Sequence, residues 1–280
     1  MTRPIPKLAG VCGWPIHHSL SPLLHGYWLR EMGVPGAYVH FAVRPDDALR
    51  AFQSLKKTSI AGVNVTLPLK GFAFESADVV TDDAKRLGVA NCLYKRGGEL
   101  VAHNTDLEGF AAPLLSALGP EAIASMPAII YGTGGAARAV IGALLSLNCP
   151  ELRLCGRTDS KSEAIVSEIN VPNLYSVPWD MRHDGIGGAG IIINASAGGM
   201  KGYPALDVEL DWASPGALVY DLIYTPHNTP LLKAAKKRGL RTLGGLEMLI
   251  AQARPSFKLF FGTAPPMHLD PTDTLLQALN

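Results

Sequence analysis

Short apolar runs alternate with amphipathic stretches along almost the whole chain, and this alternation limits the possible folds more than any other feature. The runs at 8–13, 37–43 and 62–65 have the length and composition of buried strands, and apolar residues at helical spacing mark 21–32 and 46–57. Strands that alternate with helices are typical of a mostly parallel sheet covered by helices. The sequence therefore predicts an α/β fold.

The alternation restarts after residues 119–127, a segment that contains Pro120 and Pro127 and is typical of a hinge or linker. A second series of apolar runs follows, beginning at 128–131. The chain of 280 residues is long enough for about two domains. We expect two α/β domains with a cleft between them, and in the second half a helix over 230–238 that Thr229 caps.

Composition and charge exclude several classes of protein. The 25 Lys and Arg residues against 24 Asp and Glu give a net charge of +1, whereas nucleic-acid-binding proteins normally carry a basic excess. No apolar run approaches the roughly 20 residues of a membrane span, and residues 1–7 lack the apolar core of a secretory signal. We expect a folded protein that binds neither membranes nor nucleic acids.

The cysteines and histidines give no sign of a metal site. The cysteines form no C-x-x-C motif, and the eight histidines include no H-E-x-x-H motif. Cysteines without such pairing are typical of reduced, mostly buried thiols in a cytoplasmic protein, and they are Cys12, Cys92, Cys149 and Cys155. We therefore expect a cytoplasmic location and no bound metal.

The segment Gly132-Thr133-Gly134-Gly135-Ala136-Ala137 fits the dinucleotide-binding pattern G-x-G-x-x-A. It follows the expected strand at 128–131 and opens an expected helix, which is the context that the pattern requires. Gly132 permits the tight turn, Gly134 allows close approach of a pyrophosphate, and Ala137 lets the helix pack on the strand. The helix N-terminus then offers free N–H groups to the phosphates. An ordinary strand-to-helix turn is the alternative interpretation.

The end of the next expected strand indicates which dinucleotide binds. Sites for NAD usually carry Asp or Glu there, about 20 residues after the glycines, to hold the ribose 2′-hydroxyl. This sequence has Gly156-Arg157-Thr158-Asp159-Ser160-Lys161 instead, and Arg157 and Lys161 are suited to pair with a 2′-phosphate. Asp159 would repel that phosphate unless it serves the first turn of a helix capped by Thr158. The pattern favours NADP.

Polar residues gather at expected strand ends in the first half of the chain, where parallel α/β sheets bind their ligands. Several also have structural interpretations. Ser21, before Pro22, fits a helix N-cap, and Asp106 can cap the next helix. Asn64 and Asn91 can satisfy backbone groups at strand ends. The whole group is Ser19, Ser21, Asn64, Thr66, Lys70, Asn91, Asn104, Thr105 and Asp106.

Lys70 is harder to explain as a structural residue. It falls where a helix should begin, and a cation near a helix N-terminus is unfavourable. With Asp106 it would form an ammonium–carboxylate pair. Oxidation of an alcohol needs a base for the hydroxyl proton while hydride leaves from carbon, and a lysine with a lowered pKa can serve. A neighbouring aspartate opposes that lowering of the pKa, and the sequence does not decide which of the two effects is larger.

A series of short motifs follows one order along the chain. In the first half they are Gly13-Trp14-Pro15-Ile16-His17-His18-Ser19-Leu20-Ser21-Pro22, Asn64-Val65-Thr66-Leu67-Pro68-Leu69-Lys70, Gly88-Val89-Ala90-Asn91-Cys92-Leu93 and Asn104-Thr105-Asp106. In the second half they are the glycine motif, Arg157-Thr158, Asn194 through Gly199-Met200, Tyr220-Asp221-Leu222-Ile223-Tyr224 and Gly245-Leu246-Glu247-Met248-Leu249-Ile250-Ala251-Gln252-Ala253. In this order they resemble the shikimate dehydrogenase family over nearly the whole chain.

The resemblance implies a fold, an activity and a cofactor. It implies an N-terminal α/β substrate domain at 1–108 and a C-terminal Rossmann-type NADP-binding domain at 109–245, with the last helix, about 246–280, returning to the first domain. It implies reversible, NADP-dependent reduction of 3-dehydroshikimate to shikimate, on the route to aromatic amino acids. A monomer and a homodimer fit the sequence equally well.

The resemblance also implies roles for single residues. Lys70 is the expected proton-transfer residue, and Asp106 is its partner, which holds the substrate hydroxyl. The expected substrate-binding residues are Ser19, Ser21, Thr66, Asn91, Asp106, Tyr224 and Gln252. The expected cofactor-binding residues are Gly132, Thr133, Gly134, Gly135, Ala136, Arg157, Thr158, Lys161, Leu222 and Gly245.

The chain departs from the family pattern near the expected 2′-phosphate, where Gly156 replaces a common asparagine and Lys161 an arginine, so a weaker clamp is predicted. Two alternatives stay open. One is a quinate/shikimate dehydrogenase that uses NAD or both cofactors, and the other is a catalytically silent NADP-binding regulator. Two serine hydroxyls suited to the carboxylate of shikimate favour shikimate over quinate, and an intact lysine–aspartate couple argues against a regulator.

Overall fold

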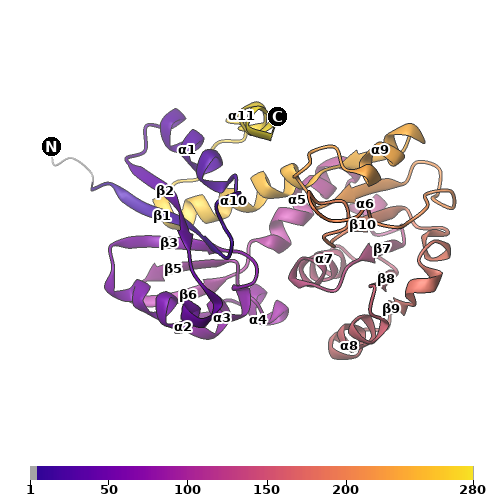
Figure 1. Ribbon diagram of the computed structural model, residues 1–280, viewed down its shortest axis with the longest axis horizontal. Coiled ribbons are helices and arrows are strands. Elements are labelled where there is room, and N and C mark those ends of the chain that lie inside the picture. Colours follow the sequence, from indigo (N-terminus) through magenta and orange to yellow (C-terminus); the bar gives the residue numbers. More distant parts are fainter. Residues whose placement is uncertain (1–4, 280) are drawn as a thin grey trace. The chain divides into compact units, whose positions relative to one another are not determined.

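The computed structural model describes residues 5–279 (Figure 1). Residues 1–4, on which the expectation about a secretory signal partly rests, and residue 280 lie outside the described residues. Leaving the last two residues aside, the chain divides into two compact units. The first runs up to Asp106 and resumes from Leu249 to Ala278, and the second comprises Leu107–Met248.

The first unit is built on a six-stranded sheet with the order β2-β1-β3-β5-β6-β4. β1 pairs in parallel with β2 and β3, and β4 with β6, but β5 is antiparallel to both of its neighbours. The expectation of a mostly parallel sheet therefore gives way to a mixed sheet in this unit. The strands are β1 (Lys7–Gly13), β2 (Gly36–Ala42), β3 (Ile60–Val65), β4 (Val79–Val80), β5 (Cys92–Arg96) and β6 (Glu99–His103).

A two-glycine turn explains the change of direction. β5 and β6 are joined by Gly97 and Gly98, which have φ angles of +60° and +88°. Two successive positive φ angles fit the tight hairpin turn that matches the twist of antiparallel strands, and glycine adopts them without a Cβ penalty. The hairpin replaces the helical crossover that a further parallel strand would need.

Helices cover this sheet, and the last long helix of the chain packs directly on it. From Leu249 onward α10 belongs to the first unit, and its Phe257 and Phe260 are buried together with Trp28 of α1. The helices are α1 (Ser21–Glu31), α2 (Pro45–Ser54), α3 (Lys70–Ser76), α4 (Asp82–Leu87), α10 (Gly245–Phe261) and α11 (Thr272–Leu279), with a 3₁₀ turn at Leu55–Lys57.

The second unit holds a six-stranded sheet in which all pairs are parallel, with the order β12-β11-β10-β7-β8-β9. In chain order this is the 3-2-1-4-5-6 arrangement of a Rossmann-type domain, which confirms the expected fold of this half. The strand order reverses between β7 and β10. The strands are β7 (Ala128–Tyr131), β8 (Leu152–Cys155), β9 (Leu174–Val177), β10 (Ile191–Asn194), β11 (Leu218–Asp221) and β12 (Arg241–Leu243).

Helices follow the strands of the second unit, and α9 begins as predicted, with the Thr229 side chain accepting the N–H of Leu232. The segment 119–127, expected as a hinge, lies inside this unit and carries the one-turn helix α6. The helices are α5 (Asp106–Leu118), α6 (Pro120–Ile123), α7 (Gly135–Ser146), α8 (Asp159–Ile169) and α9 (Pro230–Lys237), with 3₁₀ turns at Trp179–Met181 and Asp184–Ile186.

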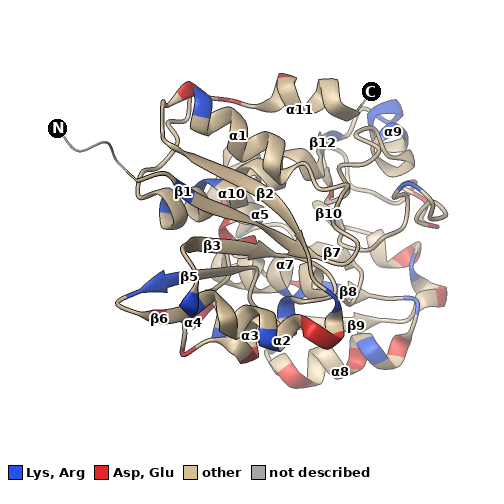
Figure 2. Ribbon diagram, turned by 60° about the vertical axis from the view of Figure 1, so that its left-hand side comes forward, with Lys and Arg blue, Asp and Glu red and all other residues tan. Residues whose placement is uncertain are grey.

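Charged side chains lie mainly on the helices. Figure 2 shows blue and red segments on α2 and α8 and blue segments on α9, whereas β7 and β10 carry no charged residue and are fully buried. No helix in the part of the chain that the structure describes is long and apolar enough to cross a membrane.

Helix α10 lies close against the sheet at Gly62 of β3. A Cβ at Gly62 would overlap the ring of Phe260 and lie 2.6 Å from the carbonyl oxygen of Leu93. Gly62→Ala should therefore lower the free energy of unfolding by about 1–3 kcal/mol through overpacking. Urea unfolding of the variant and the parent protein measures this difference.

Gly71→Ala is the matched control. Gly71 lies inside α3 with a negative φ, and an added Cβ there meets no described atom within 4 Å. Alanine should stabilise the helix at this position by roughly 0.5–1 kcal/mol. Equal unfolding midpoints for Gly62→Ala and the parent would contradict the close packing of α10 on β3.

Candidate active site

Two strand ends of the first unit bring Lys70 and Asp106 together. Lys70 begins α3 shortly after β3, and Asp106 begins α5 shortly after β6. Lys70 Nζ donates to Asp106 Oδ2 at 2.5 Å, and the two side chains are only 16% and 9% exposed. Water screens an ion pair in such a partly buried position much less than a surface pair. The contact that the sequence predicts is present, and its catalytic role stays a prediction.

Asn91 holds the other oxygen of Asp106. Its Nδ2 donates to Asp106 Oδ1 at 2.8 Å and to Thr105 Oγ1 at 3.0 Å, and its Oδ1 accepts the N–H of Thr105 at 2.8 Å. Asn104 Oδ1 accepts the N–H of Asp106 at 2.9 Å. The capping interpretation of Asp106 is therefore wrong, because its carboxylate is held by a lysine and an asparagine instead.

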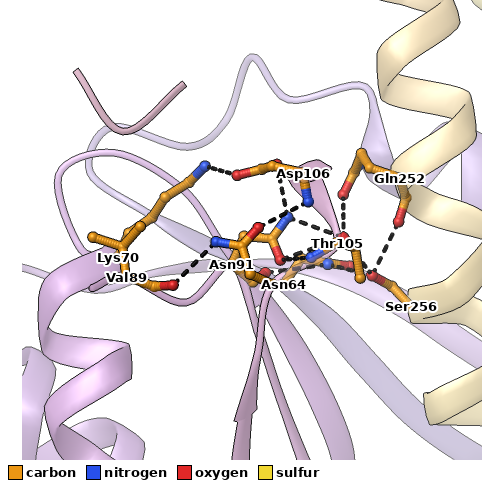
Figure 3. A network of polar contacts seen from close by, with 9 residues as sticks. Asn64, Lys70, Val89, Asn91, Thr105, Asp106, Gln252 and Ser256 are labelled. Atoms are coloured by element: carbon orange, nitrogen blue, oxygen red, sulfur yellow. Dashed lines mark hydrogen bonds and ion pairs between the residues drawn. The ribbon is translucent and has the colours of Figure 1, made fainter. Parts of the chain in front are cut away.

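Helix α10 adds a second layer of hydrogen bonds behind this pair (Figure 3). Thr105 Oγ1 donates to Gln252 Oε1 at 3.2 Å, and one turn further Ser256 Oγ accepts from Asn64 Nδ2 at 2.8 Å. The hydroxyl of Tyr38 donates to Asn64 Oδ1 at 2.8 Å. Ser256, Thr105, Asn64 and Tyr38 are all buried. The network fixes the backbone and side chains that carry Asp106.

The loop after β1 presents a pair of hydroxyl groups. Ser19 Oγ donates to Ser21 Oγ at 3.2 Å, and the N–H of Ser21 donates to Ser19 Oγ at 3.3 Å. The N-cap position of α1 is Leu20, and Ser21 is already helical, so the N-cap interpretation of Ser21 is wrong. A ring nitrogen of His40 in β2 contacts the carbonyl oxygen of Ser19 at 3.0 Å and ties the loop to the sheet.

Thr66 lies beside this loop. Its N–H donates to the carbonyl oxygen of Cys12 at 2.9 Å, and a Cβ at Gly13 would lie 2.8 Å from Thr66 Cγ2. Glycine at position 13 therefore lets the loops after β1 and β3 approach each other. Whether Thr66 and the two serines contact a substrate stays a prediction.

The loop after β7 in the second unit is shaped for a phosphate. Gly132 has a φ of +128°, and a Cβ there would lie 2.6 Å from the carbonyl oxygen of Ala195, so only glycine fits. Gly134 is the N-cap of α7 without a side-chain cap, and a Cβ there would meet no described atom within 4 Å. Uncapped N–H groups at a helix N-terminus attract phosphate. These residues fit the pyrophosphate of a dinucleotide.

Cationic side chains follow β8. Arg157, Thr158 and Lys161 are exposed around the N-terminus of α8. Asp159 occupies the first turn of α8, where its Oδ1 accepts the N–H of Trp179 at 2.8 Å, so that oxygen is engaged by the loop after β9. Thr158 is the N-cap residue, but its side chain makes no capping hydrogen bond, which corrects that expectation. The charges fit a 2′-phosphate.

Gly156 departs from the family pattern for a steric reason. A Cβ there would lie 2.5 Å from Thr133 Cγ2 and 2.9 Å from Ser162 Oγ. A larger residue does not fit at position 156 while Thr133 occupies the neighbouring loop. The methyl group of this threonine thus fills space that a side chain at position 156 would need.

The ends of β10 and β11 meet at Asp221, which is completely buried. Its Oδ1 accepts from Asn194 Nδ2 at 2.9 Å and from the N–H of Ile223 at 3.1 Å, and its Oδ2 accepts the hydroxyl of Thr229 at 2.6 Å. Burial raises the pKa of this carboxyl to about 6, although all three donors favour the charged form. A carboxylate held this firmly organises the backbone around it.

Three more expected site residues lie in the second unit. A Cβ at Gly245 would overlap the carbonyl group of Leu222, so glycine is required for that close approach. Tyr224 is half-buried, and burial raises the pKa of its phenol. The structure keeps Leu222 next to Gly245, while the contact of Tyr224 with a substrate stays a prediction.

Sequence reasoning missed Ser256 and the role of Asp221. Ser256 lies four residues after Gln252, a spacing that places both on one helix face, and this signal was available. Asp221 ends an apolar run, as a polar residue at the end of a strand often does near a ligand. For neither residue does the sequence predict which group it hydrogen-bonds to.

Known proteins are similar to this chain in sequence and in fold. A family model described as the shikimate dehydrogenase substrate binding domain matches residues 11–93. The chain is 42% identical over 264 residues to a shikimate dehydrogenase (NADP⁺) of Rhodospirillum rubrum, covering 92% of this chain and 93% of the relative. A crystal structure of shikimate 5-dehydrogenase from Thermus thermophilus, in complex with NADP(H) and shikimate, has a TM-score of 0.83 at 29% identity, covering 98% of this chain and all of that one (100%).

A dehydrogenase named for a different substrate has a similar fold. A quinate dehydrogenase from Corynebacterium glutamicum, in complex with NAD, has a TM-score of 0.86 at 26% identity, with 97% of this chain and 99% of that chain covered. Fold similarity alone does not separate the two substrates: a shikimate dehydrogenase structure in complex with NADP⁺ has a TM-score of 0.87 at 31% identity, against 0.86 at 26% for this quinate dehydrogenase.

Asp221 should make stability depend on pH. Its pKa is about 6 in the folded protein and 3.8 as the ordinary value, so the folded state binds the proton more tightly. The free energy of unfolding should therefore rise as the pH falls from above 6 towards 4, by at most ~3 kcal/mol from this group. Urea unfolding at several pH values, for the parent and Asp221→Asn, measures the effect. A difference between the two proteins that is constant over this pH range contradicts it.

Proposed function

The chain belongs to the shikimate dehydrogenase family, and from this premise we propose that Lys70 and Asp106 carry out the proton transfer of its reaction. The activity is that of an NADP-dependent shikimate dehydrogenase, an oxidoreductase that interconverts shikimate and 3-dehydroshikimate, because relatives with this activity are about 40% identical over more than nine-tenths of the chain. The single observation that carries the assignment of roles is the 2.5 Å contact between Lys70 Nζ and Asp106 Oδ2 in a partly buried position.

The proton moves through Lys70. When shikimate is oxidised, Lys70 in its neutral form accepts the hydroxyl proton while hydride leaves the same carbon, and in the reverse direction its ammonium returns the proton to the carbonyl oxygen. NADP, when bound, accepts or supplies that hydride. Asp106 holds the substrate hydroxyl and keeps the Lys70 amine in place through the 2.5 Å contact. Asn91 keeps the aspartate in place through its other oxygen.

The remaining polar residues position the substrate. In this proposal the Ser19 and Ser21 hydroxyls, which lie 3.2 Å apart, hold the substrate carboxylate, a planar acceptor that suits two adjacent donors. Thr66, Asn91 and Gln252 bind ring hydroxyls from the first unit, and Tyr224 contributes from the second. The support for these roles is their polar chemistry at strand ends and the resemblance of their motifs to the family.

The cofactor occupies the second unit in this proposal. Its pyrophosphate lies at the N-terminus of α7, against the backbone of Gly132, Thr133, Gly134, Gly135 and Ala136. Arg157, Thr158 and Lys161 hold the 2′-phosphate, and Leu222 with Gly245 borders the nicotinamide. An exposed arginine and lysine support NADP over NAD, and Oδ1 of the neighbouring Asp159 is engaged by the N–H of Trp179.

A quinate/shikimate dehydrogenase is the second candidate, supported by the fold shared with a quinate enzyme. A spectrophotometric assay with shikimate or quinate, and NADP or NAD, separates the two. We expect the highest kcat/KM for shikimate with NADP. A higher kcat/KM for quinate with NAD would overturn this assignment.

We propose that the enzyme is cytoplasmic and acts as a monomer or a homodimer. The four cysteines are free and buried, and burial raises the pKa of each thiol, which suits a protein that keeps its thiols reduced. The test is to purify the protein from its own cells, unfold it without a reducing agent and titrate its thiols. We expect all four thiols to react.

Lys70→Ala should lower kcat by about 10²–10⁴ and leave the KM for shikimate nearly unchanged, because it removes a proton-transfer group. Steady-state kinetics measure both constants. Lys85→Ala, which removes an exposed lysine of α4, is the matched control and should keep normal turnover. Near-normal turnover of Lys70→Ala would mean that this lysine is only structural.

Arg157→Ala should weaken NADP binding far more than NAD binding. The loss of a charge-assisted contact to the 2′-phosphate is worth roughly 1.5–3 kcal/mol, and NAD lacks that phosphate. Titration with each cofactor gives the two dissociation constants, and Lys233→Ala on the exposed face of α9 serves as the control. Equal losses for both cofactors would remove the basis for NADP preference at this position.

A further inference from the structure

Three loops meet where the strand order of the second sheet reverses. The reversal lies between β7 and β10, and ligands of such sheets bind beyond the carboxyl ends of the strands at this point. Gly132 after β7 lies directly against Ala195 after β10. The loop after β10 is in turn tied to the end of β11.

Asn194 makes that tie. Its Nδ2 donates to Asp221 Oδ1 at 2.9 Å and to the carbonyl oxygen of Gly198 at 2.9 Å. Its Oδ1 accepts the N–H and the hydroxyl of Ser196 at 3.0 and 2.7 Å. Every polar atom of this side chain is thus used to shape the loop after β10 and to join it to Asp221.

Asp221 then fixes the segment after β11. It accepts the N–H of Ile223, and the adjacent Leu222 carbonyl packs against Gly245, whose N–H donates to the carbonyl oxygen of Ile223 at 3.3 Å. Through Thr229, the same carboxylate sets the start of α9. One buried side chain therefore links the segment at Leu222 to the loop that abuts the glycine motif.

Burial of the Asp221 carboxylate costs free energy. No ion pair joins Asp221 to a cation among the described residues of the second unit. A buried carboxylate that relies on neutral donors alone is expensive to keep charged. A neutral residue would be the cheaper choice if the strand ends needed only packing.

We propose that Asp221 is a positioning residue for the nicotinamide end of the cofactor. It acts through Asn194 and through the backbone of Leu222 and Ile223, and this inference rests on the cofactor site proposed above. The adenosine end of the cofactor, at Arg157, depends on the loop after β8, which contacts neither oxygen of Asp221. Loss of the carboxylate should therefore weaken one end of the site and spare the other.

Two ligands distinguish an effect at the nicotinamide end of the cofactor site from an effect at the adenosine end. NADP spans the whole site, whereas adenosine 2′,5′-bisphosphate lacks the nicotinamide half. Asp221→Asn keeps the shape of the side chain but turns one oxygen acceptor into a donor that faces other donors. Calorimetry should show NADP binding weakened by about tenfold and adenosine 2′,5′-bisphosphate binding unchanged. Asp207→Asn, the same change at an exposed carboxylate of the second unit, should alter neither.

A second variant guards against failure to fold. Thr229→Val removes only the donor to Asp221 Oδ2 and the helix cap, and it should weaken NADP binding in the same selective way to a smaller extent. Unchanged binding of both ligands would overturn the proposal, and so would an equal loss for both, which indicates general loosening of the domain. Failure of the proposed function itself would instead appear in the parent protein, as absence of shikimate-dependent NADP reduction.

Discussion

The ion pair between Lys70 and Asp106 is the interaction on which the proposed proton transfer depends. A lysine at the start of a helix is unfavourable by itself, and here an aspartate at 2.5 Å compensates for that position. The aspartate stays oriented because Asn91 holds its second oxygen, and Asn91 is held by Thr105. The proposed substrate site is therefore preorganised by hydrogen bonds between side chains and backbone groups of the first unit.

The second unit reaches preorganisation by a different route. Glycines at positions 132 and 245 let loops approach so closely that any side chain would collide, and the buried carboxylate of Asp221 locks the neighbouring strand ends. The parallel strands of the second sheet bring the glycine-rich turn after β7 and the cationic residues after β8 to the same edge of that sheet.

Most strands, most helices and the motifs of the site follow from local sequence, because apolar periodicity, glycine placement and helix caps are local properties. The Thr229 cap and the glycine motif are clear cases. The direction of β5 did not follow, since Gly97 and Gly98 had to be recognised as a hairpin turn. Short edge strands such as β4 and β12 carry too few residues for a pattern. Ser256 meets Asn64 across 192 positions of sequence, and only the packed fold reveals such a pair.

Chemical rescue tests the central claim most directly. If Lys70 moves the proton, small primary amines added to Lys70→Ala should restore shikimate-dependent NADP reduction, and the restored rate should rise with the basicity of the amine. If saturating amine leaves the rate unchanged while the variant still binds shikimate and NADP, then Lys70 does not transfer the proton and the assignment of the pair is wrong.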